Sequence, residues 1–266
     1  MSSLPNNSKR PILLIRGLLR ETRHWGRFTE LLQAAFPERE IIAFDIAGNG
    51  PRYQEQSSTS VSAMVEDLKS HLSDYQASTA KTTPTGFNAD SVDIIAISMG
   101  GMIALEWMRK YPNDVHSAIL INASLSNYSP FYRRLNWQQY TNVFRYFFAS
   151  TTEQESLIFA MTTRQSSRSI IEYWIEWRRA YPVSTSNALR QLYAASRYRF
   201  KATPSSTTLL IGSQKDALVD ISCSKSLARA WHIPLFVHPD AGHDLPLDDP
   251  GWLLNKVEIF YQRQDN

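Results

Sequence analysis

The most regular feature of the chain is a series of short apolar stretches that do not alternate with polar residues. They cover residues 11–17, 41–48, 92–98, 117–124, 207–213 and 234–239. Continuous apolar runs of this length are typical of strands that are covered on both faces, as in parallel sheets. Patterns with helical spacing lie between them, at 29–36, 60–75, 99–112 and 249–262. Strands that alternate with helices predict an α/β protein, in which helices flank a mostly parallel central sheet of about six strands.

One long segment interrupts this alternation. Residues 125–203 contain no strand-like run and none of the ten glycines, but they hold 17 of the 31 aromatic residues. Patterns such as "SIIEYWIEWRRAY" have helical spacing. The sequence therefore predicts a core domain formed by residues 1–124 and 204–266, with residues 125–203 inserted late in the sheet as a helical lid.

Composition and charge narrow the class of protein. A chain of 266 residues suits one α/β domain with an insertion, and a net charge of +3 is no signature of nucleic-acid binding. The single cysteine, Cys223, excludes an internal disulfide and fits a reducing compartment. No segment is apolar enough for a signal peptide or for a membrane span of about 18 residues. We therefore expect a soluble, cytoplasmic protein. We expect no metal or other cofactor, because the histidines show no metal-ligand spacing.

A serine stands where one predicted strand turns into a helix, in the stretch "VDIIAISMGGMIALEWMRKYP" at residues 92–112. A sharp turn at the carboxyl end of a parallel strand would raise the Ser98 side chain above the sheet. Such a turn needs small residues two positions before and after the serine, and these are Ala96 and Gly100. The helix N-terminus at this point favours developing negative charge. The pattern suits an acyl-transfer nucleophile, although a serine that only begins a buried helix would produce the same pattern.

A base and an acid follow at the ends of later strands. His243 lies in a loop after the last predicted strand, and Asp216 lies in the loop after the preceding strand. The imidazole would take the serine proton, and the carboxylate would fix the tautomer of the imidazole. His238, within the last strand, is interpreted as structural, and Asp220 as a helix cap. The order along the chain is then Ser98, Asp216, His243.

Together these elements resemble the α/β-hydrolase fold superfamily. The serine turn, the Asp216 loop and the stretch "AGHDLPLDDP" around His243 match that superfamily in order and context, over about residues 11–262. Within it the chain is most similar to small, lid-bearing serine carboxylesterases, including those that cleave short acyl-carrier methyl esters. The resemblance implies an esterase with a triad of Ser98, His243 and Asp216 and an acyl-enzyme intermediate.

The resemblance also implies an oxyanion hole formed by the backbone N–H groups of Leu18 and Met99. The chain departs from the family at two positions. Arg16 stands where the family usually has a histidine, and Ala96 replaces the first glycine of the G-x-S-x-G turn. The stretch "FDIAGNG" resembles the family's Asp-x-x-Gly-x-Gly turn and is interpreted as structural.

Other functions remain open at this point. The same triad serves lyases and acyltransferases, because one fold hosts several chemistries. A hydrolase scaffold can also act as a non-enzymatic ligand receptor. A haloalkane dehalogenase is disfavoured, because those enzymes need a carboxylate where Ser98 stands. The leading hypothesis is the hydrolysis of short to medium acyl esters by a serine esterase.

The lid differs from the core in charge, with +7 on residues 125–203 and −4 on the rest of the chain. Most of its aromatic residues are expected to pack the lid helices together. Some of them, from "SPFYRRLNW" at 129–137, would line an acyl pocket. Arginines on the outer face would suit an anionic partner. That partner is either an acidic carrier protein, as the resemblance implies, or a carboxylated small substrate.

Overall fold

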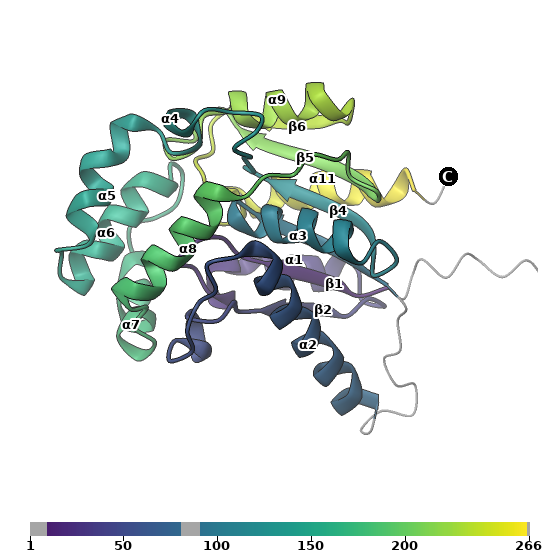
Figure 1. The fold of residues 1–266 in the computed structure, drawn as a ribbon, viewed down its shortest axis with the longest axis horizontal. Helices are drawn as coiled ribbons and strands as arrows, with labels where there is room; N and C mark the ends of the chain where they lie inside the picture. The colour runs from purple at the N-terminus through teal and green to yellow at the C-terminus, as the bar shows by residue number, and fades with distance from the viewer. Residues whose placement is uncertain (1–9, 81–90, 265–266) are drawn as a thin grey trace, which may run out of the picture.

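A sheet of six strands forms the centre of the molecule in the computed structural model, which describes residues 10–80 and 91–264 (Figure 1). In spatial order the strands are β2 (Ile41–Phe44), β1 (Ile12–Ile15), β3 (Val92–Ile97), β4 (Val115–Ile121), β5 (Thr207–Ser213) and β6 (Leu235–His238). Every neighbouring pair is parallel. The predicted α/β fold is confirmed, and the sheet is parallel throughout. The expectation about a signal peptide concerns residues 1–9, which lie outside the described residues.

Helices cover both faces of this sheet. Helices α1 (Arg27–Ala35) and α11 (Pro250–Gln262) pack on one face, and α2 (Val61–Ala80), α3 (Met99–Lys110) and α9 (Ser222–Trp231) pack on the other. Shorter helical turns are η2 (Thr22–Trp25), η3 (Gly50–Arg52) and α10 (Leu245–Asp248). No helix in the described part of the chain is long and apolar enough to cross a membrane.

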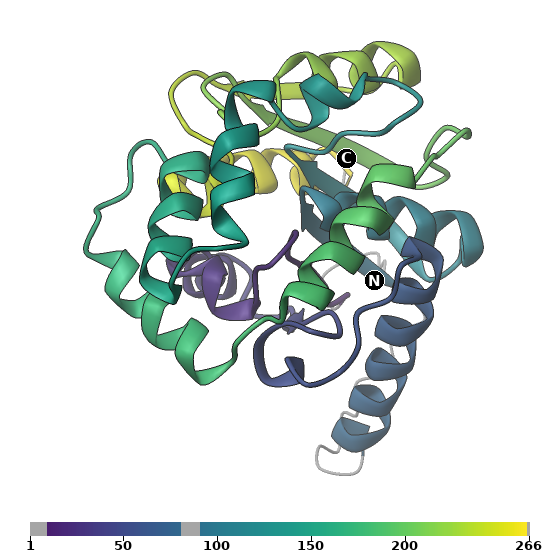
Figure 2. The same cartoon turned by 60° about the vertical axis from the view of Figure 1, so that its left-hand side comes forward.

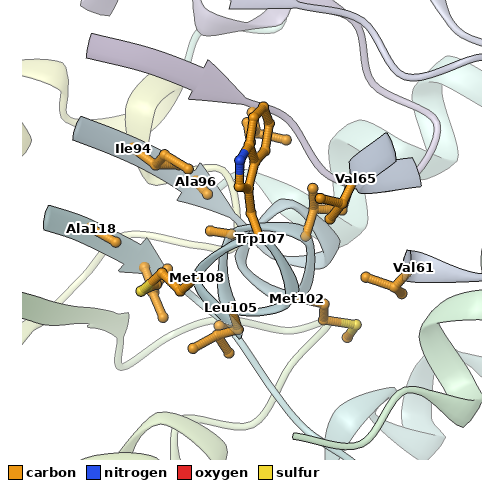
Figure 3. Close-up of a cluster of buried hydrophobic side chains, with 14 of the residues drawn as sticks. Val61, Val65, Ile94, Ala96, Met102, Leu105, Trp107, Met108 and Ala118 are labelled. Atoms are coloured by element: carbon orange, nitrogen blue, oxygen red, sulfur yellow. The ribbon is translucent and has the colours of Figure 1, made fainter. Parts of the chain in front are cut away.

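Strand β3 shows why the apolar stretches of the sequence are continuous. Its six residues are all buried. Ile94 and Ala96 belong to the apolar cluster that contains Trp107 of α3 (Figure 3), whereas Ile95 and Ile97 belong to the cluster on the opposite face. Successive side chains of a strand point to opposite faces, so a strand covered on both sides is apolar at nearly every position. The exception in β3 is Asp93, which is buried and accepts hydrogen bonds from Arg39 and Ser117.

The segment between β4 and β5 is described completely, and it folds into helices without a strand (Figure 2). These helices are α4 (Phe131–Arg134), η4 (Trp137–Gln139), α5 (Tyr140–Tyr146), α6 (Thr151–Thr162), α7 (Ile170–Ala180) and α8 (Thr185–Arg197). They share a small apolar cluster of their own, formed by Tyr146, Leu157, Ile158, Met161 and Trp174. We refer to this segment as the lid, because its helices α5 and α6 line a cavity together with residues that directly follow β1 and β3.

Side-chain caps explain where two of the longer helices begin. Ser184 accepts a hydrogen bond from the backbone N–H of Asn187 at the start of α8, over 3.1 Å. Asp249 does the same for the N–H of Trp252 at the start of α11, over 2.9 Å, and Pro250 occupies the first helical position. The acidic cap and the proline are start signals that agree with the helical spacing of residues 249–262.

Candidate active site

The turn between β3 and α3 places Ser98 in a strained backbone conformation. Its φ is 57° and its ψ is −120°, and few residues other than glycine adopt a positive φ. The turn is held by the N–H of Ser98, which donates to the carbonyl of Ile121 over 2.8 Å. Gly100 is required because a Cβ there would lie 2.4 Å from the carbonyl oxygen of Ile15. The serine thus follows the buried strand directly and begins the helix.

His243 and Asp216 come together at the carboxyl ends of the last two strands. The Nδ1 atom of His243 lies 2.7 Å from Oδ2 of Asp216, and the two side chains are 7% and 1% exposed. The other carboxylate oxygen of Asp216 accepts the backbone N–H groups of Leu218 and Val219, each over 2.8 Å. Both oxygens of the Asp216 carboxylate therefore have hydrogen-bond partners. Because Nδ1 of the imidazole faces this carboxylate, Nε2 points away from it.

The alternative acid and base considered from the sequence lie elsewhere. Asp220 accepts the N–H of Ser222 over 2.8 Å at the start of α9, in the manner of a helix cap. His238 accepts two backbone N–H groups on Nδ1 and contacts Asp249 through Nε2 over 3.2 Å. Both residues therefore make structural contacts away from His243 and Ser98.

Ser98 and His243 line the same cavity. Within residues 10–80 and 91–264, no hydrogen bond joins the Ser98 hydroxyl to the imidazole. Catalytic hydrogen bonds are often longer in the absence of substrate and shorten when substrate binds. In the structure, Asp216 thus contacts His243 directly, and His243 and Ser98 line the same cavity.

The loop after β1 approaches the serine very closely. A Cβ on Gly17 would lie 2.9 Å from the Cβ of Ser98 and 3.2 Å from the carbonyl oxygen of Ile97, so only glycine fits here. Leu18 follows in this loop and lines the cavity, and Met99 follows the serine at the first position of α3. The two residues expected to form the oxyanion hole therefore flank the Gly17–Ser98 contact.

Arg16, which departs from the family pattern, forms a buried ion pair with the residue that follows the candidate base. Its Nη1 and Nη2 atoms donate to the two carboxylate oxygens of Asp244 over 3.1 and 2.6 Å. The two side chains are only 4% and 3% exposed, and the guanidinium also lies 5.0 Å from the ring centre of Trp25. A bidentate pair of this kind fixes the loop of His243 relative to the loop of Gly17.

Asn122, at the end of β4, is a second residue that the sequence analysis did not select. Its side-chain N–H group donates to the carbonyl of His243 over 2.8 Å, and its oxygen accepts the N–H of Ser213 over 2.8 Å. It adopts a φ of 49°. Its signal in the sequence is weak, since asparagine after a strand is common in turns. The tertiary contact shows that it supports the His243 loop.

The cavity has a volume of about 130 Å³ and is lined mainly by apolar side chains. Its apolar walls come from the β1 loop and from the lid, and include Leu18, Leu19, Val143, Phe147, Ile158 and Met161. The prediction that aromatic residues of 129–137 line this pocket is wrong. Phe131 and Trp137 are 49% and 64% exposed, and the lining contributed by that stretch is Leu135. Phe131 on α4 and Trp137 on η4 are exposed, whereas Tyr146 at the end of α5 and Phe147 directly after it line the cavity.

Outside this site, the described residues contain one group with several potential metal ligands. Glu55, Asp67 and His71 lie close together at the surface. Both carboxylates already pair with Arg52, over 2.5 and 2.7 Å. The guanidinium thus occupies the position that a cation would take.

A sequence model of the "Alpha/beta hydrolase family" matches residues 12–255 of the chain. No curated protein matches it. Because the family match spans most of the chain, the protein belongs to the α/β hydrolase family.

Several solved structures are similar in fold at low sequence identity. A thermophilic esterase from Thermogutta terrifontis, with malate bound, is 20% identical over 97% of this chain and 91% of that one, with a TM-score of 0.68. A membrane phospholipase A, described as a bacterial virulence factor, is 20% identical over 97% and 80%, with a TM-score of 0.72. A hydrolase from Pseudomonas aeruginosa PA01 is 16% identical over 94% and 89%, with a TM-score of 0.69.

The buried pair of Arg16 and Asp244 leads to a prediction about stability. We expect Arg16→Met and Asp244→Leu each to lower the free energy of unfolding by about 3–5 kcal/mol, because each leaves a buried charge without a partner. The double variant should be more stable than either single variant, since it buries no unpaired charge. Urea unfolding of the four proteins gives the coupling energy.

The exposed pair of Arg145 and Glu153 is a matched control. Both side chains are about half exposed, so Arg145→Met should change the free energy of unfolding by less than about 1 kcal/mol. Additive effects of the two substitutions at Arg16 and Asp244 would contradict the role assigned to that pair.

Proposed function

We propose that the protein is a serine hydrolase that cleaves carboxylic esters through an acyl-enzyme. The observation that carries this proposal is the bond between His243 and Asp216 at a cavity that also contains the strained Ser98 turn. An imidazole held by a carboxylate, next to a serine in such a turn, is the arrangement that activates a hydroxyl as a nucleophile.

In the proposed reaction, the Oγ atom of Ser98 attacks the ester carbonyl carbon while Nε2 of His243 takes the hydroxyl proton. The carbonyl π electrons move to the oxygen, and the N–H groups of Leu18 and Met99 stabilise this oxyanion, each contributing about 3–4 kcal/mol. Asp216 stabilises the imidazolium and keeps it oriented.

Collapse of the tetrahedral intermediate breaks the bond to the alkoxy group, which leaves as the alcohol with the proton from His243. Water then attacks the acyl-enzyme carbonyl while His243 accepts one of its protons. Release of Ser98 with that proton regenerates the enzyme and frees the carboxylic acid. The largely apolar lining of the cavity supports a short to medium acyl chain as the group bound there.

The first test replaces the nucleophile. We expect Ser98→Ala to lower kcat for p-nitrophenyl butyrate by at least about 10³-fold, because no acyl-enzyme can form. A fluorophosphonate probe should add to the wild-type protein at Ser98 and not to the variant, as read by mass spectrometry. Ser186→Ala, an exposed serine of α8, is the control and should keep the wild-type rate. Absence of an adduct on the wild-type protein would favour a ligand receptor over an enzyme.

The second test separates the two aspartates. We expect Asp216→Asn to lower kcat by about 10⁴-fold, because the amide holds the imidazole in the wrong tautomer. Asp220→Asn removes a carboxylate of the same segment that caps α9, and kcat should stay within about threefold of wild type, since the amide oxygen can still accept the N–H of Ser222. If Asp220→Asn were the more damaging change, the proposed acid would be the wrong residue.

We also propose that an acidic carrier protein presents some acyl groups to the lid. The lid has eight exposed large aromatic side chains, and those of Phe131, Trp137, Phe144 and Phe148 are 49–78% exposed. Exposed arginines, among them Arg133, lie in the same stretch, which has no acidic residue between 131 and 148. Exposed aromatic rings beside arginines are typical of interface hot spots, and the positive charge complements an acidic partner.

Salt dependence tests this partner. Between about 50 and 300 mM NaCl, kcat/KM for an ester linked to acyl carrier protein should fall about tenfold or more, while kcat/KM for p-nitrophenyl butyrate should change less than twofold. Phe144→Ser combined with Phe148→Ser should weaken only the carrier-linked reaction. Tyr173→Ser, an equally exposed aromatic residue on α7, is the control. Equal salt dependence of the two substrates would refute the carrier.

A further inference from the structure

A buried group of charged side chains joins the lid to the core loop that follows β1. Arg20, from that loop, donates through Nη1 to Oε2 of Glu155 on α6, over 2.7 Å. Arg178, on α7, donates through Nε to Oε1 of the same carboxylate, over 2.8 Å. Figure 2 shows α6 and α7 beside the segment that contains η2, which follows Arg20 in the chain. We call Arg20, Glu155 and Arg178 the junction cluster; each is 6% exposed or less.

The junction cluster has one more positive charge than negative charge. Burial raises the pKa of Glu155, but the two arginines outweigh burial and the pKa lies below its ordinary value, so the carboxylate is ionised. His24, whose Nε2 is 3.0 Å from Nη1 of Arg20, does not change this balance. Burial and the charge of Arg20 hold the pKa of His24 well below its ordinary value, so this histidine is neutral. One carboxylate therefore serves two guanidinium groups.

The other carboxylates near the cluster pair with other groups or have a raised pKa. Glu21 accepts Arg23 over 2.8 Å, and Asp244 accepts Arg16 over 2.6 Å. Burial, and then the charge of Glu21, raise the pKa of Asp45 to about 7. None of these three carboxylates forms an ion pair with Arg20 within the described residues. Among residues 10–80 and 91–264, no further carboxylate therefore forms an ion pair that balances the surplus charge of the junction cluster.

The cluster also has more hydrogen-bond donors than acceptors. Buried atoms without a hydrogen-bond partner in the described part of the chain include Nε and Nη2 of Arg20, Nη1 of Arg178 and Nε1 of Trp174. All of these atoms are donors. Buried donors are nearly always satisfied in native proteins, and leaving one unsatisfied costs free energy. An acceptor would satisfy these donors, and the surplus positive charge favours an anionic acceptor.

The unpartnered atoms of Arg20 identify the shape of that anion. Nε and Nη2 form one edge of a guanidinium and point in the same direction, so together they match the two oxygens of a carboxylate. In this protein the same edge binds a carboxylate in Arg23 with Glu21, in Arg52 with Glu55 and in Arg109 with Glu106. Arg20 uses Nη1 for Glu155 and leaves this edge unused.

Arg20 also lies in the wall of the proposed active site. Arg20 and Leu19 line both the 130 Å³ cavity that contains Ser98 and a smaller cavity of about 10 Å³ that Glu155 and Arg178 line as well. The Nε–Nη2 edge itself is covered, so a carboxylate reaches it only when a covering side chain turns aside. Two arginines line the larger cavity, Arg16 and Arg20. Arg16 is paired with Asp244, so Arg20 is the arginine whose charge is incompletely matched and that would attract an anionic group on a substrate.

We propose that Arg20 forms a carboxylate-binding subsite in the wall of the active-site cavity, and that the preferred esters carry an ionised carboxylate on the acyl group. This inference rests on the proposed hydrolase function and specifies its substrate class. The acyl group stays in the cavity during both half-reactions, whereas the alcohol leaves after the first. A fixed cation in the wall therefore acts on the acyl side throughout turnover.

The experiment compares matched pairs of p-nitrophenyl esters. One member of each pair is the monoester of a dicarboxylic acid, from succinate to suberate, and the other is the ester of the neutral monocarboxylic acid of equal chain length. We expect kcat/KM for the best carboxylate ester to exceed that of its neutral partner at least about tenfold, after correction for their hydroxide-catalysed rates. A ratio near one for every chain length would overturn the proposal.

Variants of Arg20 test the assignment to this residue. Arg20→Gln leaves Glu155 paired with Arg178 alone, so the variant buries no unmatched charge. The ratio of kcat/KM for the carboxylate ester to kcat/KM for its neutral partner should fall to about one. Arg20→Lys keeps the charge without the planar edge and should give an intermediate ratio. Arg52→Gln is the control, because that arginine lies at the end of η3 with its edge filled by the exposed Glu55, and it should keep the wild-type ratio. An unchanged ratio in folded Arg20→Gln would overturn the role of Arg20.

A binding measurement distinguishes failure of the subsite from failure of the hydrolase function. Calorimetric titration of the Ser98→Ala protein with monomethyl esters of the dicarboxylic acids, and with their neutral dimethyl esters, requires no turnover. The subsite would be supported if Ser98→Ala bound the charged ester more tightly than the neutral ester and if this difference disappeared in the double variant Ser98→Ala, Arg20→Gln. This conclusion would hold even if the wild-type protein hydrolysed neither ester. Equal binding would overturn it while leaving any hydrolysis of neutral esters intact.

A free anion is the other source of the same chemistry. Two results together would show that the Arg20 edge binds a free anion. Acetate would raise the Tm of the wild-type protein but not that of Arg20→Gln, and kcat/KM would be equal for charged and neutral esters. That outcome would overturn the assignment to the substrate. Acetate that competes with the charged esters and not with the neutral ones would support it.

Discussion

The active-site end of the molecule depends on two backbone contacts that leave no room for a side chain. A Cβ on Gly100 would meet the carbonyl oxygen of Ile15 at 2.4 Å, and a Cβ on Gly17 would meet Ser98 at 2.9 Å. These contacts bring the β1 loop, the serine turn and the start of α3 within van der Waals distance. The strained φ of Ser98 persists because the surrounding parallel sheet, buried on both faces, determines the path of the backbone.

Around this turn, the parts of the site that lie on loops are held by polar contacts between distant segments. Asn122 binds the carbonyl of His243, and Arg16 binds the carboxylate of Asp244 from the opposite side. Arg16 occupies a position where the family usually has histidine, and the acid that follows His243 is its buried counterpart. Arg16 and Asp244 thus form a matched pair that anchors the loop of the candidate base to the loop of the candidate oxyanion hole.

The lid combines three environments on a few short helices. Its inner side lines the cavity with apolar residues of α5 and α6, its outer side exposes aromatic rings and arginines, and its junction with the core buries Glu155 between two guanidinium groups. Buried charge is costly unless it is matched, so the junction is the part of the lid where an additional anion changes the energetics most.

The sequence by itself determined the class of fold and predicted the candidate triad, because both leave local patterns in the chain. Strands buried on two faces need continuous apolar runs, a sharp strand-to-helix turn needs small residues around Ser98, and Asp216 and His243 each follow a recognisable strand. The wall of the pocket and the charge pairs were decided only by tertiary structure. Arg16 and Asp244 are 228 positions apart and Arg20 and Glu155 are 135 apart. Which buried charges meet, and which is left with a free edge, depends on how the loops and the lid pack, and no local pattern carries that information.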